Sequence, residues 1–161
     1  MEYMNDLSNE LIDILEKKKQ NLINILDYTK LQTIVIDAQD EQKLIEYLEN
    51  KQKHIDNINL LDDSFVVKFN QLKKILGINS LDELSSTRVD EFKKLKLELN
   101  SIYHLIEQIF EIEKENSVKI KKEYADIKSK LKEINGEKKL NSAYIVKTTD
   151  LSGGAFFDKK K

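Results

Sequence analysis

The chain has 161 residues, of which 35% are charged and 7% aromatic, with four glycines and neither proline nor cysteine. So few turn-forming residues disfavour an all-β fold, and the lack of cysteine excludes disulfides, thiolate metal sites and a cysteine nucleophile. The net charge of −2 does not favour nucleic-acid binding. We expect neither a signal peptide nor a membrane span, because no long apolar run is present.

A first helix is predicted over residues 4–36, where apolar residues recur three and four positions apart. Its last four residues, Thr33 to Ile36, are β-branched and weaken the helix end. A lone strand there would have no evident partner, so we interpret these residues as the last helical turn.

A second helix is predicted over residues 40–76, with either Asp37 or Asp40 as its N-cap. Its apolar residues fall on two interleaved heptad series, in which Lys51 and Asp62 occupy polar gaps. Gly77 follows the last apolar residue, at the position where a left-handed residue usually ends a helix.

The segment Ser80–Glu83 has the pattern of a capping box and predicts a short connecting helix over residues 81–86. A third long helix is predicted over residues 87–135. Its apolar positions alternate by three and four, as in a coiled-coil seam. The seven-residue series comprises Phe92, Leu99, Ile106, Glu113, Ile120, Ile127 and Ile134, and its companion comprises Leu95, Ile102, Ile109 and Asn116, slipping by one to Tyr124 and Leu131. Glu113 and Asn116 therefore predict one polar layer in the seam.

The predicted fold is all-α: three long antiparallel helices in a coiled-coil-like bundle over residues 1–136, followed by a flexible tail over residues 137–161. The charge is uneven, because residues 1–113 carry 14 basic and 22 acidic side chains and residues 114–161 carry 13 and 7. The tail holds two apolar patches, around Tyr144 and around Phe156 and Phe157. Such patches either pack on the chain's own bundle or dock on a partner.

No residue pattern indicates catalysis, a metal or a cofactor. His54 and His104 lie in helical heptads without a second ligand at metal-binding spacing, and no glycine-rich phosphate loop is present. A phosphate-accepting histidine on a helical bundle remains a remote alternative.

The helix order and the segment from Asp40 to Asp56, with its Gln52-Lys53-His54-Ile55-Asp56 run, resemble the FlgN-type flagellar export chaperones, as does the ending from Ala155 to Lys161. The related FliT-type chaperones have a similar pattern. The resemblance implies a cytoplasmic, non-enzymatic chaperone that binds the terminal helices of hook-associated proteins or other export substrates. It also implies delivery to the flagellar export gate.

The position of the binding surface is predicted from the seam. If the first two helices are shorter than the third, its C-terminal end overhangs them and leaves apolar residues uncovered, suited to an incoming amphipathic helix. The candidate residues are Ile120, Tyr124, Ile127, Leu131 and Ile134. A structural coiled-coil homodimer that buries the same face is the main alternative.

Overall fold

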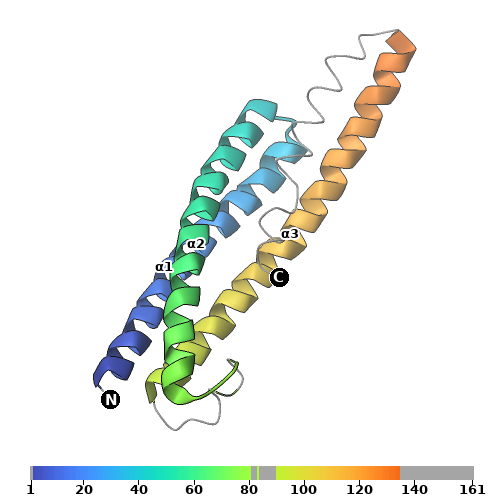
Figure 1. Ribbon diagram of the computed structural model, residues 1–161. Helices are drawn as coiled ribbons and strands as arrows, with labels where there is room; N and C mark the ends of the chain where they lie inside the picture. Colours follow the sequence, from blue (N-terminus) through green and yellow to red (C-terminus); the bar gives the residue numbers. More distant parts are fainter. Residues whose placement is uncertain (1, 81–82, 84–89, 135–161) are drawn as a thin grey trace. The chain divides into compact units, whose positions relative to one another are not determined.

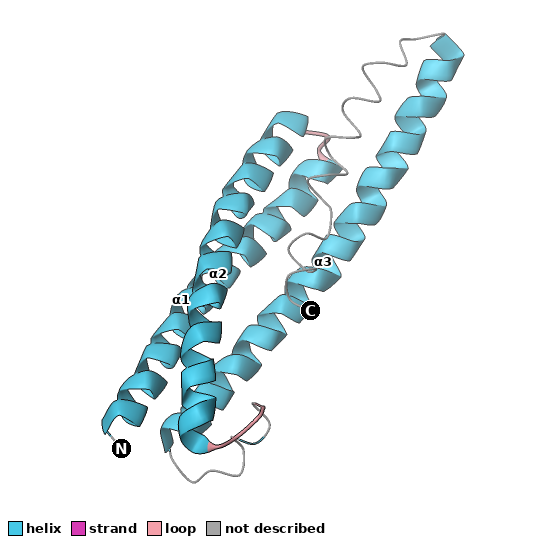
Figure 2. Ribbon diagram, in the orientation of Figure 1, coloured by secondary structure: helices cyan, strands magenta, loops and turns pink. Residues whose placement is uncertain are grey.

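The computed structural model describes residues 2–80, 83 and 90–134. The described residues form three long helices, α1 (Glu2–Asp37), α2 (Glu41–Leu76) and α3 (Asp90–Ile134), and contain no strand (Figures 1 and 2). The predicted all-α bundle is therefore confirmed, and each long helix ends within one residue of its expected end. The predicted short helix over residues 81–86 and the tail over residues 137–161 lie outside the described residues, Glu83 apart.

The turn between α1 and α2 is a Schellman motif followed directly by an N-cap. Asp40 N–H donates to the Val35 carbonyl at 2.9 Å, and Gln39 N–H donates to the Ile36 carbonyl at 3.1 Å. Gln39 has the left-handed φ of 57° that this motif requires. The Asp40 carboxylate then accepts the Lys43 N–H at 3.1 Å, which identifies Asp40 as the N-cap of α2.

The end of α2 follows the sequence prediction. Gly77 has a φ of 68°, and Ile78 N–H donates to the Lys73 carbonyl at 3.1 Å, the long bond of the same motif. Beyond it, the Glu83 carboxylate accepts the Asn79 N–H at 2.8 Å. Glu83 therefore accepts the backbone N–H of Asn79, the residue before the predicted cap Ser80.

The chain comprises two compact units. Unit 1 contains residues 1–27 and 51–108, and unit 2 contains residues 28–50 and 109–161. In unit 1, the buried side chains come from all three helices and include Leu11, Leu22, Ile58, Leu72, Phe92 and Leu95. Lys18 pairs with Asp62 at 2.6 Å, and Lys68 pairs with Glu10, so the α1 and α2 segments run antiparallel.

Lys51, which the sequence places in a polar gap of the α2 series, is buried in unit 1 with 6% of its surface exposed. A buried ammonium group loses its hydration, which favours the neutral amine. Burial accordingly lowers the pKa of Lys51 from 10.5 to about 7.

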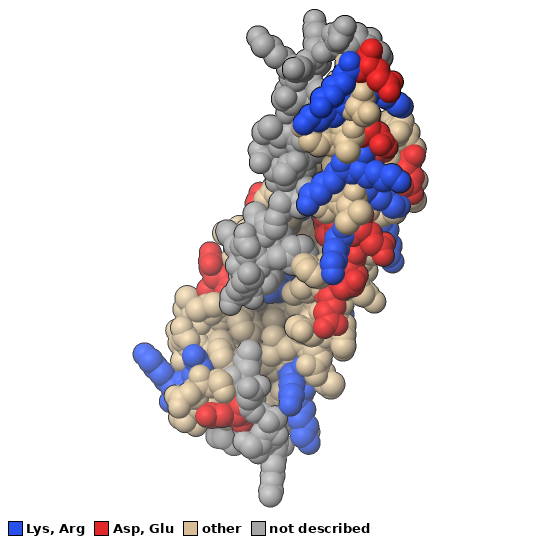
Figure 3. All heavy atoms as spheres, turned by 90° about the vertical axis from the view of Figure 1, so that its right-hand side faces the viewer, with Lys and Arg blue, Asp and Glu red and all other residues tan. Residues whose placement is uncertain are grey.

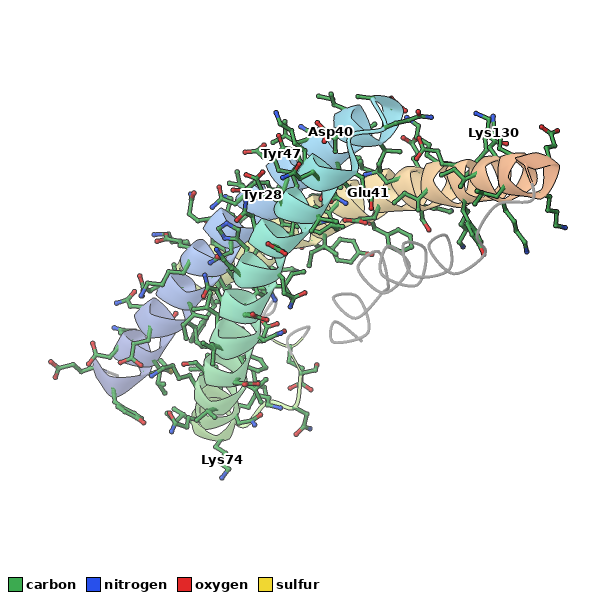
Figure 4. All side chains as sticks on the ribbon, turned by 90° about the horizontal axis from the view of Figure 1, so that it is seen from above. Tyr28, Asp40, Glu41, Tyr47, Lys74 and Lys130 are labelled. Carbon is green, nitrogen blue, oxygen red and sulfur yellow. The ribbon has the colours of Figure 1, made fainter. Side chains whose placement is uncertain are left out.

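Unit 2 has its own apolar core where α1 ends and α2 begins. Val35, Ile36, Leu44, Leu48 and Ile120 form one buried cluster, with Tyr47 packed against it. The rings of Tyr28 and Tyr47, whose positions Figure 4 labels, lie 5.9 Å apart. Val35 and Ile36, in the β-branched end of α1, fill this core, which favours the helical conformation there.

Candidate partner-binding surface on α3

The predicted polar layer is present in unit 2 and joins α3 to α1. Asn116 is almost fully buried, accepts a hydrogen bond from Thr33 Oγ1 at 2.7 Å and donates one to the Thr29 carbonyl at 3.2 Å. Thr29 Oγ1 in turn donates to the Glu113 carboxylate at 3.5 Å. Thr29 thus lies against Glu113 and Thr33 against Asn116, so α1 and α3 run parallel in this unit with a fixed register.

One turn further along, α3 contacts the residues that end α1. Lys119 Nζ lies 3.0 Å and 3.1 Å from the two carboxylate oxygens of Asp37. The side chain of Gln39 hydrogen-bonds the carboxylate of Glu123. These contacts place the α1–α2 turn at the level of Glu123, and α3 continues from Tyr124 to Ile134. Eleven further residues extend the helix by about 16 Å beyond this level (Figure 1).

The five predicted binding residues divide at this level. Ile120 has 9% of its surface exposed and belongs to the core of unit 2. Tyr124, Ile127 and Leu131 lie in the overhanging part, and each is only partly buried. The side chain of Ile134 lies outside the described ones, as do Tyr144, Phe156 and Phe157 in the tail. The candidate surface on the described residues is therefore Tyr124, Ile127 and Leu131, which we call the α3 stripe.

Basic side chains flank the α3 stripe. Exposed lysines occupy five positions around it, at Lys121, Lys122, Lys128, Lys130 and Lys132. Figure 3 shows basic and acidic side chains interleaved on this face of the molecule, and Figure 4 shows Lys130 extending away from the helix. A row of lysines beside apolar residues suits an amphipathic helix that carries acidic residues.

Glu123, at the base of the overhang, is harder to ionise than an ordinary glutamate. Burial raises the pKa of Glu123 above its ordinary value, and the nearby carboxylates of Asp37 and Asp126 raise it further, while the hydrogen bond from Gln39 opposes this effect. The sequence analysis did not predict the contacts between Glu123 and the α1–α2 turn. One available signal was the slip in the companion series, because Glu123 stands where the regular spacing from Asn116 would place an apolar residue.

The two histidines have ordinary structural surroundings. His54 Nδ1 lies 2.9 Å from the side-chain oxygen of Asn21, and the exposed His104 lies 3.7 Å from Glu107. Among the residues that the structure describes, no group of three or more His, Cys, Asp or Glu side chains is arranged to hold a metal ion. No helix in the same part of the chain is long and apolar enough to cross a membrane.

The described residues form a helical bundle in which one helix carries a partly uncovered apolar stripe, a feature typical of proteins that take up an amphipathic helix. The comparisons with known proteins identify the family. A family model described as FlgN protein matches residues 1–148, and the chain belongs to the FlgN family of flagellar export chaperones. Neither the search of curated proteins nor that of solved structures gave a match.

Proposed function

We propose that this protein is a cytoplasmic chaperone that binds the terminal helices of hook-associated proteins, keeps them from assembling early and delivers them to the flagellar export gate. Membership of the FlgN family supports the general role. The observation that carries the finer proposal is the overhang, in which α3 extends past the α1–α2 turn with Tyr124, Ile127 and Leu131 partly uncovered.

Helices that later form a filament core carry apolar stripes, which aggregate when they are left in water. Each large apolar side chain that becomes buried on binding contributes about 1.5–3 kcal/mol before association costs. Two or three such side chains supply about 3–9 kcal/mol in total before these costs. Micromolar affinity, about −8 kcal/mol net, therefore also requires burial of the client's own apolar side chains and the flanking charges.

The test is the double variant Ile127→Glu with Leu131→Glu, titrated calorimetrically with a peptide of the terminal helix of a hook-associated protein. We expect the dissociation constant to rise at least about 100-fold, equivalent to about 3 kcal/mol, because two anchors become charged. Helicity should be unchanged, since both side chains lie beyond the core of unit 2.

The matched control introduces the same two charges on the exposed side of the same segment, as Ala125→Glu with Ser129→Glu. This control should bind the peptide like the native chain. Equal binding by the native chain and the Ile127→Glu, Leu131→Glu variant, with both folded, would contradict the proposal. The tail residues Tyr144, Phe156 and Phe157 would then be the better candidates.

A further inference from the structure

A second apolar stripe lies on the outer side of α2 in unit 1. Leu60, Val67 and Ile75 are 71%, 59% and 46% exposed. Ile58 and Leu72 on the same helix are fully buried. Leu60 follows Ile58 by two residues, which is a rotation of about 200° around the helix, so Leu60 and Val67 face away from the core. Ile75 lies about 80° round from Val67, at the edge of the exposed side.

The spacing of this α2 stripe makes it complementary to itself. Leu60, Val67 and Ile75 are separated by seven and eight residues, so they are almost symmetric about Val67. When two copies of α2 pair antiparallel around a two-fold axis beside Val67, Leu60 of one copy meets Ile75 of the other. The same axis places the two Val67 side chains together and sets Ser64 opposite Gln71. A parallel pairing would instead set every residue opposite itself.

The charges beside the stripe favour the antiparallel arrangement. Asp62 and Lys68 already form ion pairs within unit 1, and Lys73 lies over the ring of Phe69 at 5.5 Å. Asp63 and Lys74, by contrast, are exposed on one flank of the stripe, and Figure 4 shows Lys74 extending away from α2. Around the same axis, Asp63 of one copy comes within about 3 Å along the helix of the level of the other copy's Lys74, and the pair occurs twice.

From this spacing and charge pattern, we propose that the α2 stripe is a self-association surface that takes the same face of a second copy of this chain in antiparallel orientation. The contact comprises three apolar side chains from each copy and two ion pairs between the copies. It therefore belongs with the smallest transient interfaces rather than with obligate dimers. The expected dissociation constant is on the order of 100 μM, and the surface is separate from the α3 stripe that binds the client.

Disulfide trapping tests the orientation directly, because the chain has no cysteine of its own. A Val67→Cys chain should form a disulfide-linked dimer on mild oxidation. A Leu60→Cys chain should not link to itself, because the antiparallel register separates the two sites by about 22 Å, far beyond disulfide reach. A mixture of Leu60→Cys and Ile75→Cys chains should link across the interface. Efficient self-linking of Leu60→Cys would overturn the proposal.

Sedimentation of the full-length chain from 10 μM to 1 mM tests the association itself. Val67→Glu should keep the chain monomeric, whereas the matched Val66→Glu change, at a neighbouring exposed residue rotated off the stripe, should not. Asp63→Lys should weaken the dimer 3- to 10-fold at low salt, and adding Lys74→Asp should restore it. A native chain that stays monomeric at 1 mM, or equal effects of Val66→Glu and Val67→Glu, would overturn the proposal. None of these changes touches the α3 stripe, so client binding by these variants tests the proposed function independently.

Discussion

Replacing Lys51 by methionine should make the protein more stable at neutral pH. Methionine keeps an unbranched side chain of similar length and carries no charge, while the buried lysine has its pKa lowered from 10.5 to about 7 by desolvation. Between these two values, the unfolded chain binds a proton that the folded chain has released. The free energy of unfolding therefore rises with pH from 7 to 10.5, and the contribution of Lys51 is flat below 7.

The size of the effect follows from the shift. One pKa unit corresponds to 1.36 kcal/mol, so a shift of about 3.5 units gives a cost of about 4 kcal/mol at pH 7, where the folded lysine is half protonated. The Lys51→Met variant should gain several kcal/mol at pH 7, and the gain should shrink steadily as the pH approaches 10.5.

Urea unfolding followed by circular dichroism between pH 6 and pH 10 measures this difference. Lys53→Met is the matched control, since Lys53 is exposed on the same helix and its removal should shift stability little at any pH. A difference between native and Lys51→Met chains that does not change over this range would refute the assignment of Lys51 as a buried lysine with a lowered pKa.

Two further changes test unit 2. Asn116→Ala should lower the free energy of unfolding by about 2 kcal/mol in urea, because the carbonyl of the buried Thr29 loses the amide donor of Asn116 and Thr33 Oγ1 loses its nearest acceptor. An unchanged midpoint would show that the polar layer does not stabilise the fold. Glu123→Gln should stabilise the chain at pH 7, because the raised pKa of Glu123 means that the folded state favours the uncharged form. That gain should disappear as the pH falls below the ordinary glutamate value, which thermal melts at pH 3.5 and pH 7 will show; equal gains at both would contradict the charge explanation.

The periodicity of the sequence predicts most of the fold because the regularly spaced apolar residues of each helix supply the buried side chains of its core. Phe92, Leu95, Ile102 and Ile109 are all buried, as the α3 seam predicts. Gly77 marks the end of α2 because its left-handed φ is costly for other residues. The end of α1 lacks this signal, because Gln39 adopts the same conformation without being glycine.

The extent of the candidate site was harder to predict. Ile120 belongs to the core rather than to the exposed surface because the α1–α2 turn reaches Glu123, and that level depends on contacts such as Lys119 to Asp37, 82 residues apart in the chain. The spacing of apolar residues within one helix does not predict the register between helices. The burial of Lys51 could not be predicted either, because a lysine at a core-facing position often bends its aliphatic chain so that the ammonium group reaches water.

The hydroxyl groups that α1 presents to α3 have a consequence during synthesis. Thr29 and Thr33 leave the ribosome some 80 residues before Asn116, a delay of about 4–16 s at ordinary elongation rates. Throughout that interval, positions 29 and 33 of the nascent α1 segment expose threonine side chains to solvent, where isoleucines would expose apolar ones. Because exposed apolar surface makes incompletely folded chains prone to aggregate, threonines at these positions reduce that tendency until the last helix is made.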